Sequence, residues 1–232
     1  MIPLWDKIPR SSWPVVTTAI IAANCFVFFQ ELTAGPAERE QIIAAYALIP
    51  ARSTAFVEGV PVGFTGGVLP FFTSMFLHGG WMHLIGNMWF LWLFGDNVED
   101  RVGHWRYVLL YVAGGLAGAV THWVFNPASQ VPTVGASGAI AAVMGAYLIT
   151  FPGARVVTLI PIIIFVTTVE IPAYIILLYW LLLQFLSGAA SVGVADPTQG
   201  GVAWFAHIGG FLAGIPLMLL LRRPRRTHYS SW

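Results

Sequence analysis

A few polar side chains interrupt three otherwise apolar segments, and their types are those used in hydrolytic chemistry. The first segment carries His78, His83 and Asn87, the second begins near Ser137, and the third contains His207. A serine hydroxyl beside an imidazole forms an activated nucleophile, because histidine titrates near neutrality and can take the serine proton. No carboxylate occurs at a matching depth, so the sequence favours a Ser137–His207 dyad over a triad with an acidic third member.

Hydrogen-bond donors for the oxyanion of such a reaction occur in the same segments. The backbone N–H of Ser137 is one candidate because it lies near a helix N-terminus. The Asn87 amide and a ring N–H of His83 are others, and residues four apart share one helix face. Gly135 and Gly138 flank the serine, where they would allow an unusual turn and a close approach of substrate.

The composition of the chain indicates that these residues are positioned by membrane-spanning helices. The chain has 232 residues, of which 57% are hydrophobic and 9% are charged, whereas an ordinary soluble domain is about 25% charged. This composition favours a polytopic membrane protein, and it excludes a disordered chain, a nucleic-acid binder and a secreted disulfide scaffold. The lone Cys25 cannot form an internal disulfide, so the redox compartment is not defined.

We expect an all-α bundle of six transmembrane helices, at about 13–32, 81–95, 107–125, 134–151, 171–186 and 203–221. One membrane-embedded domain would then cover residues 1–232, with short cytoplasmic tails at about 1–12 and 222–232. The stretch 156–169 is also apolar, but Pro161 and the flanking Arg155 and Glu170 shorten it. We therefore expect a re-entrant or interfacial segment there rather than a seventh span.

The distribution of Lys and Arg predicts the orientation of this bundle. One side would carry nine basic residues, namely Lys7, Arg10, Arg101, Arg106, Arg155, Arg222, Arg223, Arg225 and Arg226. The other side would carry only Arg39 and Arg52. Because cytoplasmic loops are rich in Lys and Arg, we expect both termini in the cytoplasm, with the bacterial inner membrane as the default location.

The expected topology brings the polar residues to one depth. The second, fourth and sixth spans all run inward, and each carries its polar group near its outer start. Small residues recur at three- or four-residue spacing on two of these spans: Ser137, Ala141 and Gly145, and His207, Gly210 and Gly214. Such stripes let membrane helices pack closely, so Ser137 and His207 would meet at the outer end of their contact.

These residues resemble the motifs of the rhomboid family of intramembrane serine proteases. The segment from His78 to Asn87 is similar to the family's histidine–asparagine motif, residues 135–138 match its GxSG motif, and residues 206–214 match its AHxxGxxxG motif. The resemblance implies a six-helix core with a long first extracytoplasmic loop. It also implies cleavage of single-pass membrane proteins near the outer face of the lipid bilayer, without a metal or other cofactor.

Residue roles also follow from the resemblance. It implies that Ser137 is the nucleophile, His207 the general base, and His83 and Asn87 the helpers of the oxyanion. It further implies that His78 holds the loop before the second helix. Two departures leave questions open: the first loop lacks the family's frequent Trp-Arg pair, and Ala141 stands where many members have a tyrosine that stacks on the catalytic histidine.

Two other readings fit parts of the sequence. A catalytically silent rhomboid-like protein could bind transmembrane clients, although such a protein needs neither Ser137 nor His207. A transporter or a metal site on His78, His83 and His207 would leave the surroundings of Ser137 unexplained. We also expect Glu99 to join Asp100 and Arg101 in an ion-pair cluster at the interface.

Overall fold

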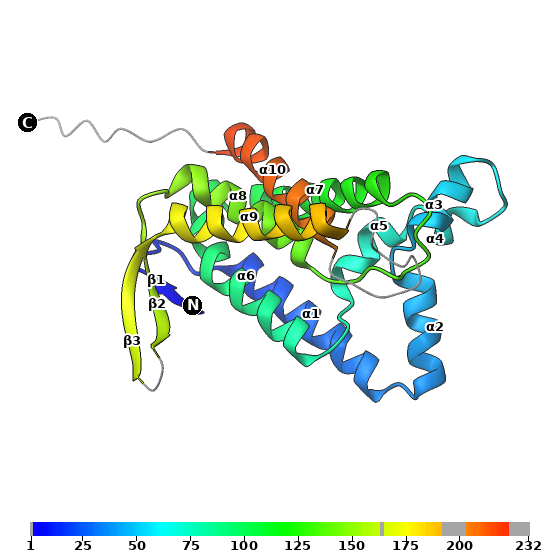
Figure 1. The fold of residues 1–232 in the computed structure, drawn as a ribbon, viewed down its shortest axis with the longest axis horizontal. Helices are drawn as coiled ribbons and strands as arrows, with labels where there is room; N and C mark the ends of the chain where they lie inside the picture. Colours follow the sequence, from blue (N-terminus) through cyan, green and yellow to red (C-terminus); the bar gives the residue numbers. More distant parts are fainter. Residues whose placement is uncertain (1, 163–164, 192–202, 223–232) are drawn as a thin grey trace, which may run out of the picture.

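The computed structural model describes residues 2–162, 165–191 and 203–222, and these form a mostly helical membrane protein. The long helices are α1 (Val15–Thr33), α6 (Trp81–Val102), α7 (His104–Phe125), α8 (Ser137–Thr150), α9 (Ala173–Ser191) and α10 (Trp204–Leu221). Shorter elements fill the segment between α1 and α6: α2 (Pro36–Tyr46), α3 (Pro50–Val57), α4 (Gly63–Gly67), α5 (Pro70–Thr73) and the 3-10 helix η1 (Ser74–Phe76). Figure 1 shows these short helices gathered at one end of the long ones.

Each of the six apolar segments expected to span the membrane overlaps one of the long helices, although α6 and α9 extend beyond the expected ends at 95 and 186. Among the described residues, α1, α7, α9 and α10 are long and apolar enough to cross a bilayer, and α8 is a shorter apolar helix. The α6 helix ends in a charged turn containing Asp96, Glu99, Asp100 and Arg101. The chain is thus a multi-pass membrane protein by the length and composition of its helices.

The α8 helix lies at the centre of the bundle, and every residue from Gly138 to Tyr147 is buried. It packs against α10 almost backbone to backbone. A Cβ atom on Gly210 would lie 2.0 Å from the Gly138 carbonyl oxygen, and one on Gly214 would lie 1.9 Å from that of Ala142. The stripe on α10 therefore packs closely on α8, as expected, but Gly210 and Gly214 meet the backbone of Gly138 and Ala142 rather than that of the expected Ser137 and Ala141.

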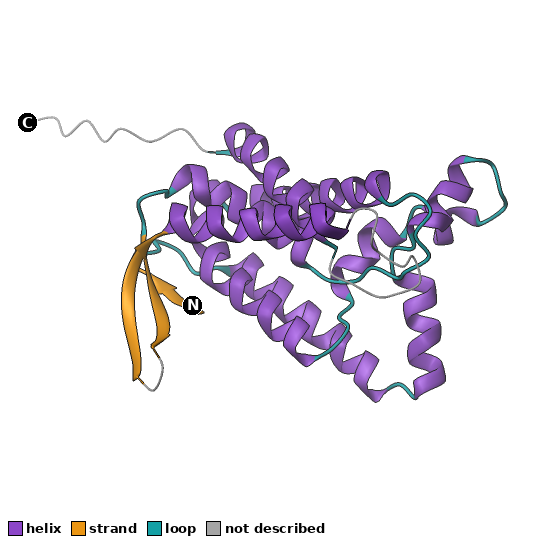
Figure 2. Ribbon diagram, viewed as in Figure 1, coloured by secondary structure: helices purple, strands orange, loops and turns teal. Residues whose placement is uncertain are grey.

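A three-stranded antiparallel sheet lies at the end of the long helices opposite to α2–α5 (Figure 2). The strand β1 (Ile2–Asp6) pairs with β2 (Arg155–Ile162), which pairs with β3 (Phe165–Pro172). The chain is therefore mostly helical rather than all-α, and the described residues of the stretch 156–169 lie in β2 and β3 rather than in a seventh span. This stretch is rich in Val, Ile and Thr, which favour strands over helices, and Pro161 sits near the hairpin end, opposite Val166.

The first loop is fixed by contacts with the connection between α7 and α8, which answers one of the open questions. Leu48 and Thr133 exchange two backbone hydrogen bonds of 3.0 and 2.8 Å, and the Ala51 N–H donates to Ser129 O at 2.9 Å. Thr54 Oγ1 donates to the Pro127 carbonyl at 2.7 Å. These contacts hold the short helices at the end of the bundle where α8 begins.

Candidate active site

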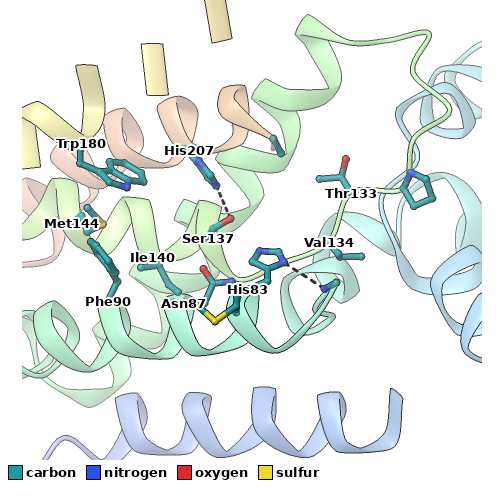
Figure 3. Close-up of a pocket in the computed structure, with 15 residues that line it drawn as sticks. His83, Asn87, Phe90, Thr133, Val134, Ser137, Ile140, Met144, Trp180 and His207 are labelled. Atoms are coloured by element: carbon teal, nitrogen blue, oxygen red, sulfur yellow. Dashed lines mark hydrogen bonds between the residues drawn. The ribbon is translucent and has the colours of Figure 1, made fainter. Parts of the chain in front are cut away.

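Ser137 and His207 lie side by side in the structure, although 70 positions separate them in the sequence. Ser137 Oγ is 2.7 Å from His207 Nε2, which is a hydrogen bond of normal length (Figure 3). Ser137 is the first residue of α8, and His207 lies in the first turn of α10. The close packing of these two helices fixes the distance between the hydroxyl and the imidazole.

The turn before Ser137 requires glycine at one position. Gly135 has φ +125°, a conformation that residues with a side chain rarely adopt. A Cβ atom there would also lie 2.7 Å from the His83 ring, so the glycine lets the imidazole approach the backbone. The Gly135 N–H donates to Ser74 O at 2.9 Å, which ties this turn to the first loop.

The α6 helix brings His83 and Asn87 to the same site, as Figure 3 shows. His83 Nδ1 accepts a 3.4 Å hydrogen bond from the Gly79 N–H. The Asn87 amide donates to His78 Nε2 at 3.0 Å, and both residues are buried. His78 is held in turn through its own N–H, which donates to Glu31 Oε1 at 3.1 Å. His78 thus contacts the site through Asn87 and through its ring, which lies 5.2 Å from the His83 ring.

The His207 ring is held by α9 and by the start of α10, which the sequence reasoning did not foresee. His207 Nδ1 lies 2.6 Å from Gln184 Oε1. The Trp180 ring lies 5.6 Å from the imidazole with the planes inclined by 38°, and Trp204 meets it edge-on at 6.3 Å. Gln184 is a single polar residue within the apolar run 173–186, so the rule that revealed the other site residues could have found it.

These side chains line a cavity of about 750 Å³, to which His83, Asn87, Ser137 and His207 all contribute. Its remaining walls are largely apolar and include Phe90, Ile140, Met144 and Trp180 (Figure 3). Within the described part of the chain, its lining contains no Asp, Glu, Lys or Arg. The arrangement thus offers a hydroxyl, an imidazole and amide donors to an apolar or peptide-like ligand.

The family model described as "Rhomboid domain" matches residues 65–224 of the chain. "Rhomboid protease GluP" of Bacillus subtilis is 32% identical over 136 residues, which are 58% of this chain and 24% of that protein. "Presenilin-associated rhomboid-like protein A, mitochondrial" of Danio rerio is 33% identical over 100 residues, which are 42% of this chain and 26% of that protein.

A shorter relative is matched over more of its length. "Putative rhomboid protease YdcA" of Bacillus subtilis is 31% identical over 114 residues, which are 47% of this chain and 57% of that protein. The chain therefore spans about a quarter of the length of the first two relatives and just over half of the third.

Proposed function

Because the chain belongs to the rhomboid family, we propose that it is an intramembrane serine protease with Ser137 as nucleophile and His207 as general base. The observation that carries this proposal is the 2.7 Å hydrogen bond between Ser137 Oγ and His207 Nε2 beside a cavity. Two of the relatives, GluP and YdcA, have the word protease in their names, which supports this proposal.

The reaction would proceed by acyl transfer. His207 takes the proton of Ser137 as Oγ attacks the carbonyl carbon of the scissile bond. The developing oxyanion is stabilised by the Ser137 N–H, the Asn87 amide and the His83 ring, which is a set of donors prepared in advance. His207 then gives its proton to the leaving amine, and it activates a water molecule that hydrolyses the acyl enzyme. This chemistry proceeds without a metal or other cofactor.

The substrate would be a transmembrane segment of a single-pass membrane protein. A peptide bond within a helix is shielded by its neighbours, so the segment must unwind locally to reach Ser137. The cavity beside the dyad is lined mostly by apolar groups, which suits a chain that arrives from lipid.

The finer architecture belongs to the same proposal. The six long helices form a six-span bundle in one membrane-embedded domain, with the first loop and the dyad at the extracytoplasmic end. Both termini face the cytoplasm, which in a bacterial inner membrane agrees with the nine-to-two distribution of Lys and Arg. An impermeant thiol reagent should label Glu40→Cys but not Arg10→Cys in intact cells when Cys25 is replaced by Ser. The reverse labelling would overturn this orientation.

The central experiment compares wild type, Ser137→Ala and His207→Ala after purification in detergent. Wild type should cleave a model single-pass substrate and react with a fluorophosphonate probe at Ser137. Both variants should fold, yet neither should cleave nor be labelled. Undiminished cleavage by Ser137→Ala would refute the assignment. A wild-type protein that binds the substrate and leaves it intact would favour the silent, client-binding alternative.

A further inference from the structure

Gln184 is buried within α9 and faces the dyad rather than lipid. Its side chain is only 7% exposed, whereas the neighbouring Leu183 and Phe185 are 41% and 60% exposed. Its Oε1 lies 2.6 Å from His207 Nδ1, on the far side of the imidazole from Ser137. A buried amide in an apolar helix is costly unless it is hydrogen-bonded, and this contact supplies the partner.

The two hydrogen bonds of His207 are compatible with only one neutral tautomer. The amide oxygen of Gln184 carries no hydrogen, so His207 Nδ1 must be the protonated nitrogen that donates to it. His207 Nε2 is then free of hydrogen and accepts the Ser137 hydroxyl proton across the 2.7 Å contact. This is the tautomer that a general base for Ser137 requires.

The orientation of the ring is fixed by the same face of α9. Trp180 precedes Gln184 by four residues, so the two side chains project from one side of the helix. The Trp180 ring contacts the His207 imidazole at 5.6 Å and the Phe211 ring at 6.1 Å, one turn further along α10. Trp180 therefore covers the ring of His207 while Gln184 holds its edge. Ala141 is too small to do either.

An uncharged acceptor suits this place better than a carboxylate. Within the described residues, the cavity beside the dyad has no Lys or Arg to balance a buried anion. A carboxylate there would bear a desolvation cost that a neutral amide avoids.

We propose that Gln184 is the positioning residue of the dyad, selecting through its amide oxygen the His207 tautomer that can deprotonate Ser137. The inference rests on the proposed protease function, since it assigns the group that orients its base. Gln184 touches neither substrate nor the reacting atoms, so it acts only through His207.

The test compares three variants of the full chain. Gln184→Met keeps the length and apolar body of the side chain but removes the acceptor. Gln184→Glu restores an acceptor oxygen at the same reach. Leu183→Met is the matched control, because it makes a similar change one residue away on the lipid-exposed side of α9. Each variant is assayed for kcat and KM on a model single-pass substrate, and unfolding temperatures verify that it is folded.

A second readout reports the tautomer directly. Nitrogen NMR of protein carrying 15N-labelled histidine distinguishes a protonated from an unprotonated ring nitrogen, and His207→Ala identifies the signals of His207. Wild type should show His207 protonated at Nδ1, whereas Gln184→Met should show a mixture or the other tautomer. This measurement needs no turnover, so it tests Gln184 even if the proposed protease activity fails.

The expected outcome is a fall in kcat of about tenfold or more in Gln184→Met, with KM nearly unchanged. Gln184→Glu should recover part of the loss, and Leu183→Met should behave as wild type. Wild-type kcat in Gln184→Met, or an unaltered His207 tautomer, would overturn the inference. If Gln184→Met does not fold, Gln184→Asn provides the same test, because it withdraws the oxygen by one methylene group.

Discussion

Glu99, near the end of α6, caps the start of α1 by accepting hydrogen bonds from Thr17. The Thr17 N–H and hydroxyl each donate to Glu99 Oε2 at 2.7 Å, and the Val16 N–H donates to Oε1 at 2.8 Å. The first N–H groups of a helix lack partners within it, and negative charge is favoured at that end. The residue before α1 is Pro14, which provides no side-chain cap. The N-terminus of α1 is therefore capped by a side chain from a neighbouring helix.

Replacing Glu99 by Gln should destabilise the fold with little direct effect on the dyad. The substitution removes the negative charge and replaces one acceptor oxygen by an NH₂ group. Because that NH₂ group cannot accept a hydrogen bond, at least one backbone N–H at the start of α1 loses its partner. We expect a loss of about 2–3 kcal/mol in the free energy of unfolding. Denaturation in detergent measures it, with probe labelling at low temperature as the check on Ser137.

Asp100→Asn is the matched control for this change. Asp100 accepts hydrogen bonds of 2.8 Å from the Ser11 hydroxyl and 2.6 Å from the Ser12 hydroxyl, in an exposed setting. Its replacement should cost under about 1 kcal/mol. Equal losses in the free energy of unfolding would show that the buried hydrogen bonds of Glu99 stabilise the fold no more than the exposed ones of Asp100. We expected Glu99 in an ion-pair cluster with Asp100 and Arg101 at the interface; in the structure Glu99 is fully buried, and its Oε1 lies 2.6 Å from His104 Nδ1.

Gly214→Ala should separate α10 from α8. The added Cβ would lie 1.9 Å from the Ala142 carbonyl oxygen, which belongs to the backbone and cannot turn aside. We expect a loss of about 1–3 kcal/mol and a sharp fall in probe labelling, because the same helix contact sets the Ser137–His207 distance. Gly153→Ala is the control, since nothing lies within 4 Å of its added Cβ and Gly153 does not line the cavity beside the dyad. A stable, fully labelled Gly214→Ala protein would contradict the packing argument.

The helices and much of the site were predictable because apolar length and rare polar residues are strong signals in a membrane protein. A span must be long and apolar, so each of the six long helices overlaps a segment that the hydropathy indicated. Ser137, His207, His83 and Asn87 stood out because a polar group in lipid is costly. The small-residue stripes then indicated which helix faces meet.

The parts that were not predictable depend on contacts between distant segments. The sequence of the β2–β3 hairpin is a short apolar run. Hydrophobic periodicity alone cannot distinguish a short buried strand from a helix in such a run. The strand β1 pairs with an edge of β2, and the paired residues lie 150 to 157 positions apart in the sequence. Gln184 followed the same polar-residue rule as the site, but its partner His207 lies on another helix, and only the fold shows that they meet.

Asp6 should make stability depend on pH. It lies in β1, where Tyr147 and Asn97 donate hydrogen bonds to Oδ2. Burial raises the pKa of Asp6 above its ordinary value of 3.8, an effect stronger than the opposing hydrogen bonds from Tyr147, the Ile8 backbone and Asn97. The folded protein therefore binds this proton more tightly than the unfolded chain does.

The sign of the effect follows by linkage. Between pH 3.8 and the raised pKa of Asp6, the folded state holds more protons, so the free energy of unfolding falls as pH rises. Below pH 3.8 the contribution is fully present, and above the folded pKa it has been lost. Asp6→Asn should flatten this part of the stability profile, measured by denaturation at several pH values. A profile identical to wild type would contradict a raised pKa at Asp6.

The Asn87 amide has two N–H donors, and within the described part of the chain one of them is hydrogen-bonded. One N–H donates to His78 Nε2 at 3.0 Å, which leaves the other for a substrate oxygen in the cavity that Asn87 lines. Asn87→Ala should lower kcat by about 10²–10³-fold with a small change in KM, as for loss of one oxyanion donor. His78→Ala should lower kcat less, since it removes a group that orients the Asn87 amide and packs against the His83 ring but donates nothing to the oxyanion itself. Steady-state kinetics on a model single-pass substrate measures both, and a larger loss in His78→Ala than in Asn87→Ala would place the donor elsewhere.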